Sequence, residues 1–251
     1  MKIKSTILFL LMLLAFFCQG QEQPLFEKAN QLYVNEEYAK AINIYEQIIH
    51  SGKESAELYF NLGNAYYKTG NANMAILNYE RALLLSPNDE DIIFNLRIAN
   101  QFVVDNIEAL PKPFFVRWYE SVINLYPSDT WAIISTSSFV VFLFLLGFFI
   151  FSRSVAVKRF SFLLGILLFV VTLFTFSFSS KQSKKIKGHK YAIVFCPRVT
   201  VKSSPSSTGT DLFLIHEGLK VEISDSLDTW REIRLADGNQ GWLPDSCIVK
   251  I

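Results

Sequence analysis

The chain has 251 residues with a formal net charge of +1, of which 51% are hydrophobic and 15% aromatic. This balance leaves no basic surface for nucleic acid, and the three histidines have no Cys or His partners at metal-ligand spacing. Because no glycine-rich phosphate loop, nucleophile elbow or pair of catalytic acids is recognisable either, the sequence predicts a non-enzymatic protein with no metal site and no cofactor.

The first twenty residues are predicted to be a secretory signal peptide. Lys2 and Lys4 precede an apolar segment over residues 7–17, which is too short to span a bilayer, and Gly20 supplies the small residue before the cleavage point. Cys18 is not expected to carry a lipid, because a bulky aromatic residue precedes it. Cleavage after residue 20 would export the segment that follows.

A self-similar pattern with a period of 34 residues covers residues 21–110, an acidic segment with six Lys or Arg and thirteen Asp or Glu. Four positions of the first copy recur in the second: Leu25, Ala29, Ala41 and Tyr45 become Tyr59, Gly63, Ala75 and Tyr79. With Leu62, Tyr66, Ala82 and Pro87 in addition, residues 56–89 resemble a tetratricopeptide (TPR) repeat. The resemblance implies an all-α TPR solenoid over residues 21–110, in which Gly63 and Ala75 meet where two helices cross. The first copy matches less closely, and residues 91–99 begin a third copy.

The TPR resemblance implies a concave groove that binds a polypeptide segment of a partner. Its lining would be Phe26, Asn30, Phe60, Asn61, Asn64, Tyr67, Lys68 and Asn95. A side-chain amide offers both a donor and an acceptor, which suits recognition of an extended backbone. The alternative is a purely structural role, since such asparagines are common in these repeats whatever they bind. No clamp for a C-terminal carboxylate is expected, because Phe26, Asp91 and Asn95 occupy the positions where cations would be needed.

Residues 111–130 are predicted to form an interfacial helix and a linker. Phe115, Trp118, Val122 and Leu125 share one helical face. A short helix with such a face is typical of segments that lie in the plane of a membrane interface.

Two uncharged apolar runs, residues 131–152 and 160–180, are each long enough to cross the hydrocarbon core as a helix. The seven residues between them are too few for a domain, so the runs predict a two-helix transmembrane hairpin over residues 131–180. Neither run contains an ionisable residue, which favours anchoring over a role as a transporter subunit.

The charges beside the hairpin indicate conflicting orientations. Export by the signal peptide places residues 153–159, with three basic side chains, in the cytoplasm, as the positive-inside rule prefers. Five lysines in the linker at residues 181–190 favour the opposite orientation. Giving the signal peptide precedence, we expect a bacterial inner-membrane protein with both flanking domains in the periplasm. The lysines are then expected to snorkel to the interface, with specific lipid binding as the alternative.

From residue 191 onward the chain consists of short β-rich runs, with a tight turn at Asp237-Gly238. The succession Val199-Thr-Val-Lys-Ser-Ser-Pro205, His216-Glu-Gly218, Trp230 and Gly241-Trp242-Leu-Pro244 resembles a bacterial SH3 domain over residues 191–251. This resemblance implies a small all-β barrel that contacts cell-wall peptides or proteins. Trp230 and Trp242 would form its ligand surface, or else belong to its core.

Two cysteines, Cys196 and Cys247, fall in the first and last of these β-rich runs, which are neighbours in SH3-type barrels. In an oxidising compartment they could form a disulfide. The alternative is that both are small apolar side chains with free thiols.

The order of the parts, from signal peptide through TPR repeats, interfacial helix and transmembrane hairpin to the SH3-like domain, resembles the BatE-type proteins of Bacteroides aerotolerance operons. That resemblance implies von Willebrand A-type Bat proteins and a MoxR-type ATPase as partners, in envelope stress or complex assembly. The leading hypothesis is a membrane-anchored adapter or scaffold that binds a polypeptide through its TPR groove. The alternative is a cell-wall sensor that binds peptidoglycan through its SH3-like domain.

Overall fold

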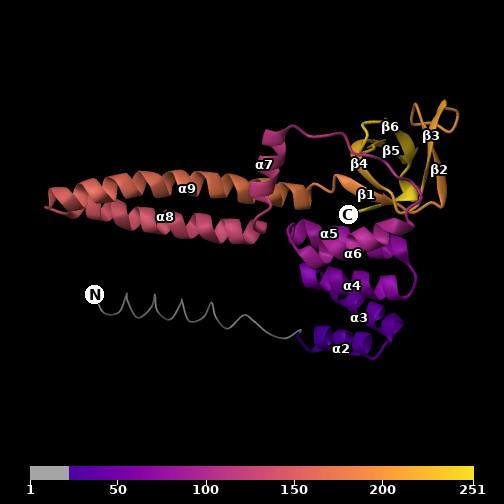
Figure 1. The fold of residues 1–251 in the computed structure, drawn as a ribbon, viewed down its shortest axis with the longest axis horizontal. Helices are drawn as coiled ribbons and strands as arrows, with labels where there is room; N and C mark the ends of the chain where they lie inside the picture. The colour runs from indigo at the N-terminus through magenta and orange to yellow at the C-terminus, as the bar shows by residue number, and fades with distance from the viewer. Residues whose placement is uncertain (1–22) are drawn as a thin grey trace. The chain divides into compact units, whose positions relative to one another are not determined.

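The structure is a computed structural model that describes residues 23–251, so the predicted signal peptide and Cys18 lie outside the described residues. The chain divides into two compact units, Met1–Glu54 and Ser55–Ile251. The helices are α2 (Gln23–Val34), α3 (Tyr38–His50), α4 (Ala56–Lys68), α5 (Ala72–Leu85), α6 (Glu90–Ala99), α7 (Phe114–Ile123), α8 (Ser128–Phe151) and α9 (Val155–Lys187). Seven strands follow them along the chain (Figure 1).

In the first unit, α2 and α3 pack together around Tyr45, whose side chain is fully buried. The Tyr45 hydroxyl donates a hydrogen bond of 2.6 Å to Asn30 Oδ1, and its ring lies 6.0 Å from that of Phe26. The connection between the helices passes through Glu36 at a φ of 63°, a conformation that is costly for a residue with a side chain. The later repeat has Gly70, at a φ of 79°, 34 residues further on.

In the second unit, each TPR helix begins at a side chain that accepts a hydrogen bond from the first turn. Ser55 Oγ accepts from the Leu58 N–H at 3.1 Å, and Asn71 Oδ1 accepts from the Met74 N–H at 3.1 Å. Asp89 Oδ1 caps α6 in the same way. These caps satisfy amide groups that have no partner inside the helix, and so they fix where each helix starts.

Helix α5 is buried on nearly every side. Six consecutive residues from Ala75 to Glu80 are buried, because α5 packs against α4, α6 and strand β1 (Tyr191–Val194). A helix that is covered all round needs no amphipathic stripe, which explains its mixed pattern of apolar residues. The C-terminal sheet therefore covers a face of α5 that the short repeat array alone would leave open.

The close approach between α4 and α5 differs from the prediction. Gly63 was expected to lie against Ala75, but its nearest neighbour is the ring of Tyr79. A Cβ atom at Gly63 would lie 2.7 Å from Tyr79 Cδ1 and from Cε1. The Tyr79 ring is held in place because its hydroxyl donates to Asn64 Oδ1 at 2.7 Å. The small residue thus makes room for a flat ring rather than for a second small residue.

Substitution Gly63→Ala is expected to destabilise the second unit by about 1–3 kcal/mol, because the added methyl group overlaps a buried ring that cannot move freely. Thermal unfolding of the full chain in detergent would measure the change. Gly147→Ala is the control, since a Cβ at Gly147 meets no atom within 4 Å. Equal melting temperatures for the two variants would contradict this assignment.

Helices α8 and α9 lie side by side along their length (Figure 1). The seam between them contains the buried small or polar residues Ser135, Ser161, Gly165 and Thr175. Aromatic rings, such as those of Phe142 and Phe169, also meet across it. Ser135 Oγ donates to the Thr172 carbonyl at 3.2 Å across the seam. Such residues allow helices to approach closely where no hydrophobic force drives them together. Both helices are long and apolar enough to cross a membrane.

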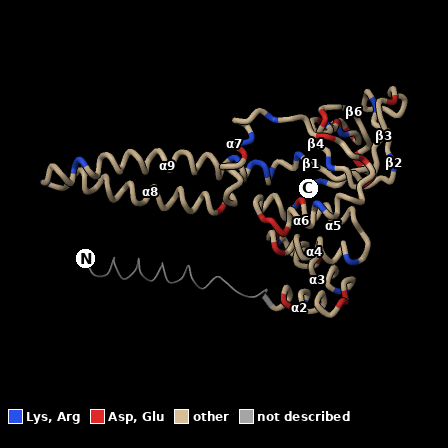
Figure 2. The backbone as a smooth tube through the Cα atoms, viewed as in Figure 1, with Lys and Arg blue, Asp and Glu red and all other residues tan. Residues whose placement is uncertain are grey.

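The hairpin is tighter at its tip and longer at its base than predicted. Helix α9 begins at Val155, so most of the expected loop at residues 153–159 is helical. It also continues to Lys187, so the lysine-rich segment predicted as a linker is helical up to that residue. Lys, Gln and Ser are all compatible with a helix, and Gly188 is the first residue that favours termination. The charged residues of the hairpin lie at its two ends, and the stretch between them carries none (Figure 2).

The C-terminal region is an antiparallel sheet of seven strands in the order β3-β2-β6-β5-β4-β1-β7. Beside β1 the strands are β2 (Arg198–Lys202), β3 (Asp211–His216), β4 (Lys220–Leu227), β5 (Trp230–Arg234), β6 (Gln240–Pro244) and β7 (Ile248–Lys250). Its core consists of small and branched residues such as Val194, Val201, Ile233 and Leu243. Gly238, at a φ of 93°, forms the expected tight turn between β5 and β6. Strand β6 contains a glycine, a proline and a lone tryptophan, so no alternating pattern of apolar residues marks it.

A disulfide joins Cys196 and Cys247, whose Cα atoms are 4.9 Å apart. The cysteines flank the strands instead of lying within them: Cys196 follows β1 and Cys247 precedes β7. The pairing of Val194 with Ile248 in these neighbouring strands brings the two side chains together. The disulfide therefore links the first strand of the sheet along the chain, β1, to the last strand, β7.

Replacing both cysteines by alanine is expected to lower the stability of the sheet by about 2–4 kcal/mol, because the unfolded chain loses the cross-link between residues 51 apart. Chemical denaturation, followed by the fluorescence of the two tryptophans in the sheet, would measure this. In protein isolated without reductant, thiol alkylation should leave both cysteines unmodified. Alkylation of both would contradict the disulfide.

Candidate functional site

Three phenylalanines, Phe26, Phe60 and Phe94, are spaced by 34 residues, one at the start of each repeat. In the first two repeats the ring packs against a tyrosine of the following helix, Phe26 against Tyr45 and Phe60 against Tyr79, each at 6.0 Å. The third repeat stops after its first helix, α6, and Phe94 is 58% exposed. An apolar side chain that its own fold does not cover is a candidate contact for a partner.

The asparagines predicted to line the groove are engaged within the repeats. Asn64 Oδ1 accepts from the Tyr79 hydroxyl and, at 2.8 Å, from Asn95 Nδ2. Asn30 Oδ1 accepts from a tyrosine in the same way. These oxygen atoms are therefore occupied by structural hydrogen bonds, which supports the alternative that the asparagines stabilise the repeat.

Of the other groove residues, Tyr67 packs its ring edge-on at 6.1 Å against Phe102, and Lys68 is exposed. Phe26 and Asn30 lie in the first unit, and the remaining predicted residues, including Asn61, lie in the second. Phe94 and Phe102 were not predicted, although the 34-residue period places them at the positions of Phe60 and Lys68. Extending the period into the third repeat would have found both.

Trp230 and Trp242 lie on one face of the sheet. Trp230 pairs with Pro244, and Trp242 pairs with Glu232, and paired residues of antiparallel strands point the same way. The buried Leu243 alternates with Trp242 and points into the core. Both tryptophans are half-buried on the opposite side, so they are not part of the main core.

Polar contacts join the sheet to the helices of the second unit. Asn73 Nδ2 donates to Glu217 at 2.6 Å, and Lys220 pairs with the mostly buried Glu80. Asp105, in the segment after α6, accepts from the backbone N–H of His216 at 2.6 Å and contacts its ring Nδ1 at 2.9 Å. His216 is thereby held by a residue more than a hundred positions earlier in the chain.

One carbonyl joins three helices at the base of the hairpin. Ile123 is the last residue of α7, and its carbonyl accepts 2.8 Å hydrogen bonds from both Trp131 Nε1 and Gln182 Nε2. The last carbonyls of a helix have no hydrogen-bond partner inside the helix, so Trp131 and Gln182 provide the missing donors. Phe178 of α9 contacts the rings of both Tyr119 and Trp131 around this point. The predicted interfacial helix is thereby fixed to both apolar helices.

Helix α7 also carries large apolar side chains that are exposed. Phe114, Phe115 and Trp118 are 76, 60 and 67% exposed. Helix α7 ends at Ile123, so Leu125 lies beyond the helix and does not complete the predicted helical face. The exposed side chains are consistent with contact to a membrane interface.

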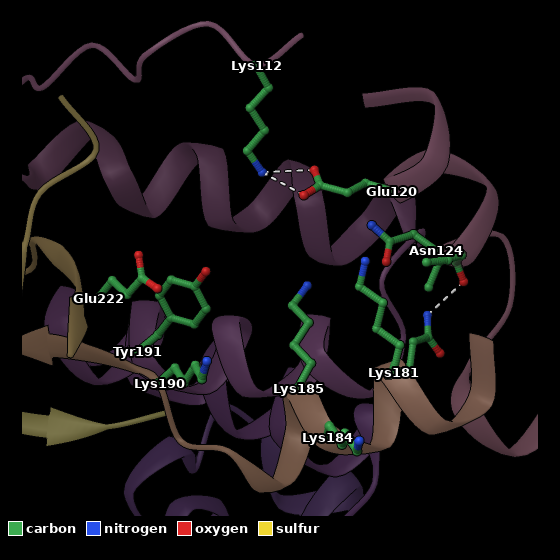
Figure 3. A pocket seen from close by; sticks show the side chains of 11 residues that line it. Lys112, Glu120, Asn124, Lys181, Lys184, Lys185, Lys190, Tyr191 and Glu222 are labelled. Atoms are coloured by element: carbon green, nitrogen blue, oxygen red, sulfur yellow. Dashed lines mark hydrogen bonds and ion pairs between the residues drawn. The ribbon is translucent and has the colours of Figure 1, made fainter. Parts of the chain in front are cut away.

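A pocket of about 390 Å³ lies between α7, the end of α9 and the sheet; we call it the junction pocket (Figure 3). Five lysines line it, together with two glutamates. The lysines are Lys112, Lys181, Lys184, Lys185 and Lys190, and the glutamates are Glu120 and Glu222. Figure 3 shows Lys185 pointing into the pocket from α9, while Lys112 reaches in from the opposite side. The pocket therefore has an excess of positive charge.

Some of these charges are already partnered. Lys112 Nζ forms an ion pair with Glu120 at 2.8 Å, and Lys181 Nζ lies 4.2 Å from the centre of the Tyr119 ring. Burial raises the pKa of the Tyr191 phenol, and the Glu222 carboxylate raises it further. Tyr191 therefore stays neutral, with a hydroxyl group that can donate a hydrogen bond.

Within residues 23–251 there is no group of three or more His, Cys, Asp or Glu side chains that could hold a metal ion.

A comparison with known protein families matches residues 56–89 to the tetratricopeptide repeat. The match covers α4 and α5, the helices that hold Gly63 against Tyr79. No curated protein matches the chain. A tetratricopeptide repeat is a protein-interaction unit, and this chain contains one.

Removing both donors to the Ile123 carbonyl is expected to destabilise the attachment of α7 by more than the sum of the two single changes. Trp131→Phe and Gln182→Leu each remove one of the two hydrogen bonds, so each should lower the stability by about 1 kcal/mol. The double variant leaves a buried carbonyl without a partner, which adds a desolvation cost. Hydrogen exchange of the α7 amides in detergent would measure the loosening, and strictly additive changes would contradict a shared acceptor.

Proposed function

We propose that this protein is a membrane-anchored, non-enzymatic adapter that binds a polypeptide segment of a membrane-associated complex. The tetratricopeptide match at residues 56–89 carries the proposal, because such repeats present extended surfaces to other proteins. The binding surface would be the exposed side of α4 and α6 and the turn after α6, with Lys68, Phe94 and Phe102 as its contacts. The two apolar helices α8 and α9 would be the anchor.

The proposed location is a bacterial inner membrane, with the TPR repeats and the sheet in the periplasm. The disulfide between Cys196 and Cys247 supports this side of the membrane, because such bonds persist in oxidising compartments. The exposed aromatic face of α7 supports contact with the interface. A cleaved signal peptide at residues 1–20 would deliver the chain to this side.

The proposed partners are the von Willebrand A-type Bat proteins, acting together with a MoxR-type ATPase. This part of the proposal rests on the order of the parts, which resembles BatE-type proteins of Bacteroides aerotolerance operons. A role in envelope stress or aerotolerance would follow from such a complex.

A second candidate function is binding of peptidoglycan by the sheet, as a bacterial SH3-type domain. The position of Trp230 and Trp242 on one outer face favours it, because paired aromatic side chains can line a ligand groove. In this case the TPR repeats would serve as a spacer.

Partner recovery distinguishes the two functions. In the full-length protein, Phe94→Ala combined with Lys68→Ala should reduce the recovery of crosslinked membrane partners about tenfold, as expected for the loss of a binding hot spot. Both side chains are exposed, so the fold should tolerate the change. Mass spectrometry of proteins purified from crosslinked membranes, compared with wild type, is the measurement.

Trp242→Ala in the same full-length protein is the matched control. It should leave partner recovery unchanged under the adapter function and abolish pelleting with purified sacculi under the peptidoglycan function. Identical partners from wild type and the TPR variant, with sacculus binding that depends on Trp242, would overturn the adapter. Membrane insertion is tested separately, by resistance of the protein to extraction with alkaline carbonate.

A further inference from the structure

The junction pocket lies where the apolar part of α9 ends. Ser180 is the last residue of the apolar run, and Lys181 and Lys185 follow it on the same helix. On the other side of the pocket, α7 carries the exposed Phe115 and Trp118. If the hairpin spans a bilayer, both features place the pocket at the depth of the lipid headgroups.

Part of the positive charge in this pocket has no ion-pair partner in the protein, and burial together with the charge of Lys220 lowers the pKa of Lys185. Glu120 is paired with Lys112, so its charge is balanced. In the part of the chain that the structure describes, no ion pair joins Lys185 or Lys190 to a carboxylate. Cationic groups that face one another without a counterion favour the binding of an anion.

The lining offers hydrogen-bond donors of the kind that bind phosphate. Lysine ammonium groups donate only, and the Asn124 amide and the neutral Tyr191 hydroxyl add further donors. Gln182 contributes less, because its amide donates to the Ile123 carbonyl. A volume of about 390 Å³ is within the range of sites for small molecules.

We infer that the junction pocket binds the phosphate group of an anionic phospholipid, with Lys185 as its central cation. The inference rests on the proposed insertion of the hairpin into a membrane. It differs from simple snorkelling, in which each lysine is attracted to the surface independently and no saturable site exists. Binding at this point would hold α7, α9 and the sheet to one lipid molecule.

The test compares two lysines of the same helix. Lys185 lines the pocket, whereas Lys187, two residues further on, does not. Lys185→Gln should weaken the binding of phosphatidylglycerol about tenfold, and Lys187→Gln should change it less than about twofold. Native mass spectrometry of the delipidated full-length protein in detergent, titrated with phosphatidylglycerol, gives the apparent Kd. Equal effects of the two variants would indicate diffuse attraction only and would overturn the site.

A variant with the opposite expected sign excludes misfolding as the cause. Glu222→Gln removes a carboxylate that lines the pocket, so it should tighten phosphatidylglycerol binding, which a disturbed fold could not do. Phosphatidylethanolamine should bind about tenfold more weakly than phosphatidylglycerol, and inorganic phosphate at millimolar concentration should not displace the lipid. Equal binding of the two lipids, or displacement by phosphate, would overturn the assignment. Carbonate extraction of the Lys185→Gln variant reports insertion independently of lipid binding.

Discussion

The arrangement around the hairpin depends on the carbonyl of Ile123. The carbonyl belongs to the last residue of α7, and it accepts hydrogen bonds from Trp131 of α8 and from Gln182 of α9. Because the carbonyl is buried and away from water, its two hydrogen bonds cannot be exchanged for solvent without cost. The contact fixes the angle at which α7 leaves the apolar helices, and it thereby defines one wall of the junction pocket.

The repeat region depends on a second kind of support. The second unit holds the matched repeat, α4 with α5, and the single further helix α6, and units of this kind bury their faces only against neighbours. Here strand β1 covers α5, and the pairs Asn73 with Glu217 and Lys220 with Glu80 lie along that contact. The sheet is thus part of the stability of the second unit, and α6 is left with the open edge at which Phe94 is exposed.

The position of charge links these features to the proposed anchoring. The exposed faces of α8 and α9 are mostly apolar, and the buried Ser161 and Gly165 lie in the seam between the helices. At the base of the hairpin, lysines follow the apolar run from Lys181 onward, beside α7 and the junction pocket (Figure 2). The chain thus has a long apolar hairpin, a group of lysines at the base of that hairpin, and a folded region after them.

The sequence by itself determined the two apolar helices and the central repeat, because length, hydropathy and a 34-residue period are local properties of the chain. It also indicated a β-rich region from residue 191 onward and the turn at Gly238. Only the tertiary structure decided the rest, such as the pairing of Asn64 with Tyr79, the helical state of the lysine-rich segment and the pairing of β6 with β2. These features depend on partners distant along the chain, and no local pattern records which side chain will occupy a hydrogen-bond acceptor or line a pocket.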